Sequence, residues 1–361
     1  GEREEMLEEE REGDSVEVLH LGPHHPATGG DLHLVLEVDG ETVVGARANP
    51  GLLHSGFEKL GECFTYTQFI AATDRISYHS PFAGNLAYAL AVERMLEVEV
   101  PRRAQFVRVI LAEMARCADH LMWLAQQTRG VGVETVAHYA LAAREHLCDL
   151  FEATTGARLM TSFTRIGGVA EDVPDHFEQM VQDGLRRLRH LLVEVDGVLT
   201  HNRAWLERSR GVGTIRAEEA VAWGASGPVA RAAGLERDVR HSTPYAVYQE
   251  FDFEIPVGAE GDVYDRYLVR MEEMRQSIAL LRQICGKMPE GPINVVDPKG
   301  ALPEKERVLM SMEELIHHFI VATQGIDAPE GEVYFGAENP KGELGFYINS
   351  KGGGVPHRLK I

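Results

Sequence analysis

The feature that most constrains the fold is the stretch RAQFVRVILAEMARCADHLMWLAQQ, residues 103–127. Its apolar residues recur at three- and four-residue spacing, which is typical of a helix, and together they point in most directions around the helix axis. A surface helix carries a single apolar stripe, whereas a helix that is apolar nearly all round belongs in the interior. Because the chain has 361 residues, it can surround this helix with several others. The stretch therefore predicts a helical bundle with residues 103–127 at its centre.

Other segments predict further helices around that centre and β structure at both ends. Helical periodicity continues over 82–98, 134–154, 175–208, 263–287 and 306–322. Residues 15–48 instead alternate apolar and polar side chains, and Asp39-Gly40 within them is typical of a hairpin with a type I′ turn. Residues 326–361 hold short β-type runs separated by glycines, which predicts a small meander.

We therefore expect an α+β fold that is mostly helical. Its parts are an acidic lead-in at 1–14, an N-terminal β element at 15–55, a helical bundle at 56–325 and a C-terminal β element at 326–361. The chain stops at HRLKI, in what its pattern indicates is mid-strand, so we also expect a further C-terminal piece to follow.

Composition and charge argue against several classes of function. The net charge of −20 disfavours nucleic acid as a partner, because such proteins gather Lys and Arg on one face. No apolar run reaches about 18 residues, so we expect no transmembrane helix, and any work at a membrane would need partner chains. The four cysteines lie far apart without a C-x-x-C pair, which disfavours an iron–sulfur or zinc site built by this chain alone.

The loop GPHHPATGG, residues 22–30, is the first candidate site. His25 precedes a proline and is therefore held extended. Neighbouring histidines on an extended chain point in different directions, so His24 and His25 are poorly placed to chelate one ion. Gly29 and Gly30 allow a tight bend that shows backbone to a ligand. A metal site, a structural turn and a ligand-facing loop all remain open, with the last favoured.

The second candidate is NPGLLHSGFEKLGECFTYTQFIAATDRISYHSP, residues 49–81. Tyr78 lies beside Arg75 and His79 in sequence, and a tyrosine in such company could donate a hydrogen bond to a carbonyl or quinone oxygen. His54 lies earlier in the same stretch. The alternative is a loop-to-helix junction whose charged residues only cap and pair, and spacing alone favours that alternative.

Several stretches, taken in order, resemble one known family. They are GPHHPATGG, GLLHSGFEK, DRISY, LAYALAVERML, RIGGVAEDVP, GVGTIRAEEA, YDRYLVRMEEMRQS, SMEELIHHF and PKGELGFYI. They resemble the quinone-site subunit of respiratory complex I, the proton-pumping NADH:quinone oxidoreductase, which is the D-type subunit in bacteria and the 49 kDa subunit in mitochondria. The resemblance runs from about residue 18 to residue 361.

The resemblance implies a fold shared with the large subunit of nickel–iron hydrogenases, a helical bundle flanked by β elements. It implies a peripheral-arm protein on the cytoplasmic side of the inner (plasma) membrane, held by the other complex I subunits, membrane-arm subunits included. A small subunit carrying a 4Fe-4S cluster would lie beside this chain, with quinone as the substrate between them. The chain itself would bind no redox cofactor and no metal, since the hydrogenase cysteine pairs are absent.

Carried over residue by residue, the resemblance implies a quinone site on these loops. Tyr78 takes the place of the tyrosine that hydrogen-bonds the quinone head group, and Arg75 that of the arginine just before it. His25 matches the histidine of the family's G-P-x-H-P turn, and His54 the histidine in the loop after the hairpin. The expected quinone-binding set is His24, His25, Thr28, Gly29, His54, Arg75, Tyr78, His79 and Gly130, with Tyr78 catalytic.

Two positions depart from the family's pattern. After Thr28 the family has a histidine where this chain has Gly29, and by ungapped alignment Gly130 replaces the aspartate that partners that histidine. Three explanations stay open. The chain is a complex I variant in which His24, His79 or a water replaces the donor, or a paralogue in a related membrane redox complex with another acceptor, or an assembly scaffold with a vestigial pocket.

Overall fold

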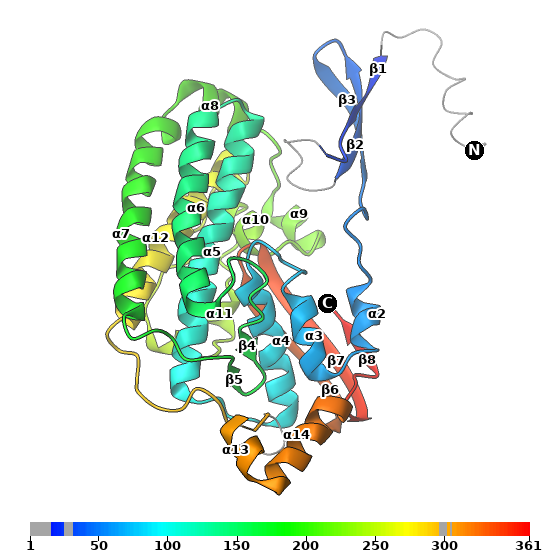
Figure 1. The fold of residues 1–361 in the computed structure, drawn as a ribbon. Coiled ribbons are helices and arrows are strands. Elements are labelled where there is room, and N and C mark those ends of the chain that lie inside the picture. The colour runs from blue at the N-terminus through cyan, green and yellow to red at the C-terminus, as the bar shows by residue number, and fades with distance from the viewer. Residues whose placement is uncertain (1–15, 25–31, 296–301, 304) are drawn as a thin grey trace, which may run out of the picture. The chain divides into compact units, whose positions relative to one another are not determined.

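The computed structural model, which describes residues 16–24, 32–295, 302–303 and 305–361, contains long helices and small antiparallel sheets (Figure 1). The expected α+β class is confirmed. The chain divides into two compact units, the first made of Gly1–Ser55 with Gln126–Val133 and the second of Gly56–Ala125 with Glu134–Ile361. The acidic lead-in at 1–14 lies outside the described residues. The likeness to the hydrogenase large subunit stays a prediction.

The first unit is built on a three-stranded antiparallel sheet in the order β1-β2-β3. Its strands are β1 (Val16–Leu21), β2 (His33–Asp39) and β3 (Thr42–Asn49). The predicted hairpin is confirmed, but its predicted turn type is wrong. Asp39 pairs with Thr42, so the two central residues are Gly40 and Glu41, and only Gly40 has a positive φ, 62°. A type I′ turn needs positive φ at both central residues, whereas type II′ needs it only at the first.

The centre of the second unit is α5 (Arg102–Gly130), as the sequence predicts. Every residue from 106 to 121 is buried, and only the end of the helix, from Gln126, belongs to the first unit. The other long helices of the second unit are α4 (Pro81–Leu96), α6 (Glu134–Thr155), α7 (Phe177–Val195) and α12 (Val263–Ile284). α7 packs against α6 and α12, while hydrogen bonds between buried side chains join α12 to α5.

Two predicted helices are interrupted. The range 175–208 contains α7, a π-helical turn at Asp196–Thr200 and α8 (Arg203–Ser209), and the range 306–322 contains α13 (Lys305–Met310) and α14 (Met312–Gln324). Polar caps mark both breaks. The Asn202 side chain accepts a hydrogen bond from Trp205 N at 3.2 Å, and Ser311 Oγ accepts one from Glu314 N at 3.5 Å. Such caps start a new helix because they satisfy backbone N–H groups that have no helical partner.

The predicted C-terminal meander is confirmed. β6 (Ala328–Asn339), β7 (Gly342–Gly353) and β8 (Arg358–Lys360) pair antiparallel in that order. α4 packs on β6 and β7, where the Tyr88 and Phe346 rings meet edge to face at 5.4 Å. The remaining short elements are α2 (Phe57–Gly61), α3 (Tyr66–Thr73), β4 (Thr164–Arg165), β5 (Gly168–Val169), α9 (Ala217–Ala222), α10 (Gly227–Ala232), α11 (Val239–Ser242) and a 3₁₀ turn at Tyr248–Glu250.

Candidate functional site

The opening loop contributes one described residue of its predicted site. His24 is exposed at the bend that follows β1. The other predicted residues of the loop, His25, Thr28 and Gly29, lie outside the described residues. Their role in binding therefore stays a prediction.

His54 and Gly130 also belong to the first unit. His54 is exposed, and its backbone N–H donates a hydrogen bond to the Gly51 carbonyl at 3.0 Å. Gly130 is the exposed last residue of α5. Gly130 thus falls in the same compact unit as the sheet that carries the opening loop, although the two segments are about 100 residues apart in sequence.

The segment from 74 to 80 carries the remaining predicted residues, in the second unit between α3 and α4. Arg75 is exposed, and its guanidinium donates a hydrogen bond to the Ala71 carbonyl of α3. The Tyr78 and His79 rings meet edge to face, with their centroids 4.4 Å apart. Tyr78 is half-buried, and among the described residues its hydroxyl has no hydrogen-bond partner. A phenol in that state is able to donate to a ligand.

Side-chain hydrogen bonds at its first residue and in its middle hold this segment in place. Asp74 is buried, and one of its oxygens accepts from Ser162 N at 2.9 Å and from Ser162 Oγ at 2.5 Å. Burial raises the pKa of the Asp74 carboxyl, and the bonds from Ser162 only partly offset that effect. Further along, Ser77 Oγ donates to Asn339 Oδ1 at the end of β6, at 3.3 Å. The segment that carries Tyr78 is therefore tied to Ser162 and to the end of β6.

His79 lies against an ion pair between α5 and the turn that joins β6 and β7. Its Nδ1 is 3.6 Å from Asp119 Oδ1 on α5, and Lys341 Nζ lies 2.6 and 2.5 Å from the two oxygens of the same carboxylate. Burial, and after it the charge of Lys341, lower the pKa of His79 to about 4, while Asp119 acts in the opposite direction. At pH 7 the His79 imidazole is therefore neutral, mainly because it is buried and secondly because of the nearby charge of Lys341.

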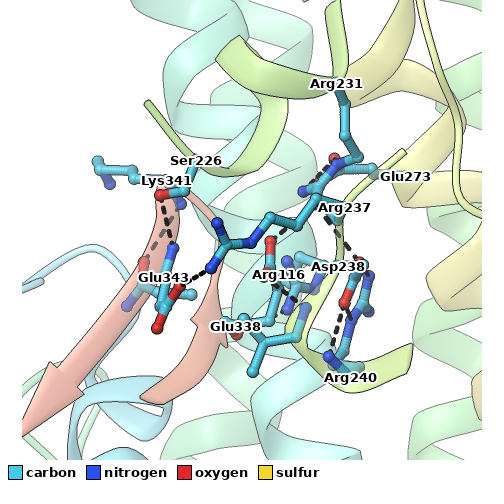
Figure 2. Close-up of polar contacts among 12 residues, drawn as sticks. Arg116, Ser226, Arg231, Arg237, Asp238, Arg240, Glu273, Glu338, Lys341 and Glu343 are labelled. Carbon is cyan, nitrogen blue, oxygen red and sulfur yellow. Dashed lines mark hydrogen bonds and ion pairs between the residues drawn. The ribbon is translucent and has the colours of Figure 1, made fainter. Parts of the chain in front are cut away.

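The second unit also contains a buried ion cluster that sequence reasoning missed (Figure 2). Its members come from α5, α10, α11, α12, β6 and the residue before α11. They are Glu113, Arg116, His120, Arg231, Asp238, Arg240, Glu273 and Glu338. Three arginines face four carboxylates, so the charges nearly balance, as a buried set requires.

The geometry of the buried ion cluster links elements that are far apart in sequence. His120 Nε2 lies 2.7 Å from Glu273 Oε2, and Glu273 Oε1 accepts from Arg231 Nε at 2.8 Å. Arg231 also donates to Glu338 Oε1 on β6 at 2.9 Å (Figure 2). Asp119, which pairs with Lys341, directly precedes His120 of the buried ion cluster on α5. The signal in the sequence was a set of charged residues inside the most apolar helix.

The buried ion cluster also shifts the acidity of its members. Burial opposes ionisation of Glu113, but Arg240 and Arg116 outweigh it and hold the pKa at about 2. Burial raises the pKa of Glu338, and the nearby charge of Asp238 raises it further. Of these two carboxyl groups, Glu338 therefore keeps a proton more readily than Glu113.

A cavity of about 540 Å³ lies away from Tyr78, lined among others by Ser226, Arg237 and Glu343, of which Arg237 and Glu343 pair at 3.0 Å. Within the described ranges, no group of three or more His, Cys, Asp or Glu residues is placed to hold a metal ion. No helix among the described residues is long and apolar enough to cross a membrane.

Comparisons with known proteins give a consistent result. The model of the family described as "Respiratory-chain NADH dehydrogenase, 49 Kd subunit" matches residues 130–361. The chain is 48% identical over 359 residues to the D-type subunit of NADH-quinone oxidoreductase from Methylacidiphilum infernorum, a match that covers 99% of this chain and 86% of that protein. It is 47% identical over 343 residues to the D-type subunit of the same enzyme from Akkermansia muciniphila, covering 95% and 83%. It is 49% identical over 344 residues to a D-type subunit, numbered 1, from Opitutus terrae, covering 95% and 81%.

Proposed function

This chain belongs to the family of the 49 kDa subunit of respiratory-chain NADH dehydrogenase, the D-type subunit of NADH-quinone oxidoreductase, and we propose that it forms the quinone pocket of that enzyme. It works as a subunit of an oxidoreductase, and other complex I subunits are its partners. The observation that carries the proposal is Tyr78, a half-buried residue whose hydroxyl has no partner among the described residues and whose segment is held by the hydrogen bonds of Asp74 and Ser77.

Tyr78 is the residue that positions and protonates the quinone. A phenolic O–H held at the edge of a rigid segment can donate to a quinone carbonyl without first breaking a protein hydrogen bond. It then supplies a proton as the oxygen gains electron density. Arg75, exposed three residues earlier, adds a positive charge to the same segment.

We also propose a quinone-binding role for the expected residues of the first unit, which are His24, His25, Thr28, Gly29, His54 and Gly130. Because residue 29 is a glycine, it offers no side-chain proton donor, and we assign that role to Tyr78.

The chain holds no redox cofactor in this proposal. Electrons reach the quinone from a 4Fe-4S cluster in an adjacent small subunit, and membrane-arm subunits hold the chain at the cytoplasmic side of the membrane. Exposed apolar residues support assembly with partners, because a chain that works alone rarely leaves large apolar patches open. On α14 these are Met312, Leu315, Ile316, Phe319 and Ile320, each at least 43% exposed.

The N-terminal sheet supports the same view. No described residue of its three strands is buried, and Val18, Val43 and Val44 are all more than half exposed. A small sheet needs an apolar face packed on something to be stable. Partner subunits supply that covering in the assembled enzyme.

Replacing Tyr78 by Phe in the assembled enzyme tests the proposal. Loss of the hydroxyl should lower quinone reduction by about 100-fold or more, the usual range for a positioned acid. NADH oxidation by an artificial acceptor should stay normal, since that reaction bypasses the quinone. Tyr139→Phe is the matched control, because Tyr139 is an exposed tyrosine on α6. Normal quinone turnover in Tyr78→Phe would favour the scaffold or another acceptor over a quinone site at Tyr78.

A further inference from the structure

His79 occupies a place that suits a proton carrier. Its ring lies edge to face with that of Tyr78, with the ring centroids 4.4 Å apart, and its side chain is 15% exposed, so solvent can reach it. On its other side, Nδ1 lies 3.6 Å from Asp119 Oδ1. A histidine can take a proton at one ring nitrogen and release one from the other, which makes it suited to relay between two environments.

The groups around His79 set when it carries charge. Asp119 faces it from α5, Lys341 from the turn between β6 and β7, and Arg144 from α6. Burial lowers the pKa of His79 most, the two positive groups lower it further, and Asp119 opposes them. The imidazole is therefore neutral at rest. A new negative charge at the Tyr78 oxygen would raise the pKa of His79, because an adjacent anion favours the imidazolium.

We propose that His79 returns a proton to Tyr78 after the tyrosine has given its own to the reduced quinone. The inference rests on the proposed function, since it gives His79 a role only if Tyr78 meets the quinone. His79, neutral at rest, first takes a proton from solvent at one ring nitrogen. An N–H bond of the resulting imidazolium then breaks, its electron pair stays on nitrogen, and the O–H bond of Tyr78 forms, which leaves the imidazole neutral again. No electron moves in the step, because the electrons that reduce the quinone come from NADH through the enzyme.

Asp119 and Lys341 are positioning residues in this scheme. Lys341 occupies both oxygens of the Asp119 carboxylate and so fixes its orientation towards Nδ1. The Lys341 side chain is 58% exposed and the Asp119 side chain 4%, so the pair runs from the surface to the buried side of the ring. The hydrogen bond from Ser77 to Asn339 ties the segment that carries His79 to the β6–β7 turn that carries Lys341. These hydrogen bonds therefore connect the segment that carries Tyr78 and His79 to Lys341 and Asp119.

The test replaces His79 by Gln in the assembled enzyme. Quinone reduction should fall by roughly 10- to 100-fold at pH 8 and by less at pH 6, because direct protonation of the tyrosinate by solvent becomes faster in acid. Added imidazole should restore part of the rate. His201→Gln, which alters a histidine exposed between α7 and α8, is the matched control and should leave the pH profile unchanged.

The Tyr78→Phe background separates this inference from the proposed function. There, adding His79→Gln should cause no further loss, because the relay has nothing left to protonate. If Tyr78→Phe alone leaves quinone reduction normal, the proposed function fails and the relay fails with it. If Tyr78→Phe blocks the reaction but His79→Gln keeps the native rate and pH profile, only the relay is overturned. A loss in His79→Gln that is equal at all pH values and insensitive to imidazole would assign His79 a structural role and also overturn it.

Discussion

The guanidinium of Arg108 on α5 forms a bidentate pair with the carboxylate of Glu93 on α4, at 2.6 and 3.0 Å, and neither side chain is more than 4% exposed. The same guanidinium donates to the carbonyls of Arg165 and Gly168, and Glu93 accepts from Gly167 N at 2.7 Å. One buried pair thus joins two core helices to the β4–β5 hairpin.

Glu93→Ala should therefore destabilise the second unit by about 3–5 kcal/mol, because it leaves the Arg108 charge buried without its partner. Replacing both residues by Leu should recover most of that loss, since no isolated charge remains. Chemical denaturation of the purified chain measures both effects. Arg203→Ala is the control: its pair with Glu207 is an exposed i,i+4 contact, so its loss should cost less than about 1 kcal/mol. If Arg203→Ala destabilised the chain as much as Glu93→Ala, burial of the Glu93–Arg108 pair would not explain the loss of stability.

Acid should weaken the buried ion cluster in a defined window. The folded chain holds the pKa of Glu113 at about 2 and that of Asp238 at about 2, below their ordinary values of 4.5 and 3.8. Lowered carboxyl pKa values give stability that is present above the unfolded value and is lost as the pH falls through the folded value. We expect a loss of a few kcal/mol between about pH 4.5 and pH 2. Glu338, whose pKa is raised, acts in the opposite sense.

Denaturant midpoints measured across that pH range test this expectation. Glu113→Gln should be less stable than the native chain at pH 6, because Arg240 and Arg116 lose their acid, and the slope of its stability with pH should be flatter. A slope identical to that of the native chain would show that Glu113 does not contribute to the acid response.

Gly168 tests the packing of the β4–β5 hairpin. A Cβ at this position would lie 2.0 Å from Asn294 Oδ1 and 2.2 Å from the Ile293 carbonyl oxygen, so the backbone of residues 293–294 would have to move. Gly168→Ala should therefore cost about 2 kcal/mol or more. Gly197→Ala is the matched control, because a Cβ there meets nothing within 4 Å, and it should be neutral or slightly stabilising. Denaturant midpoints of the two variants give the comparison.

Local patterns predicted those parts of the fold that local physics decides. Apolar residues on most sides of the 103–127 helix predicted that it is central, and alternating apolar and polar residues around Gly40 predicted the hairpin. Both patterns can be recognised in sequence because the spacing of side chains on one face follows from backbone geometry alone. The turn type was missed because pairing register depends on the partner strand, where an irregularity at Glu37 and Val38 shifts the pairing. The caps at Asn202 and Ser311 were visible as residue types, but periodicity carried each predicted helix past them.

The candidate site divides in the same way. Tyr78 and His79 could be singled out from sequence because they are neighbours in it. Asp119 and Lys341 could not, since they lie 222 residues apart and meet only when β6 and β7 pack beside α5. The charged residues within the apolar face of α5 were the available signal, because buried charges need partners even when sequence does not name them.

The charges of Asp119 and Lys341 should move the pKa of His79 in opposite directions. Lys341→Met removes a cation and leaves Asp119 unpaired beside the ring, so the pKa of His79 should rise above its native value of about 4. Asp119→Asn removes the anion and leaves Lys341 uncompensated, so the pKa should fall further. Diethyl pyrocarbonate reacts with neutral imidazole, so the pH dependence of His79 modification, read by mass spectrometry with His201 as the exposed reference, follows each shift. The double variant should lie between the two single ones, because each change removes the charge that the other exposes. Equal midpoints in all four proteins would mean that burial alone, and not the Asp119–Lys341 pair, sets the charge of His79.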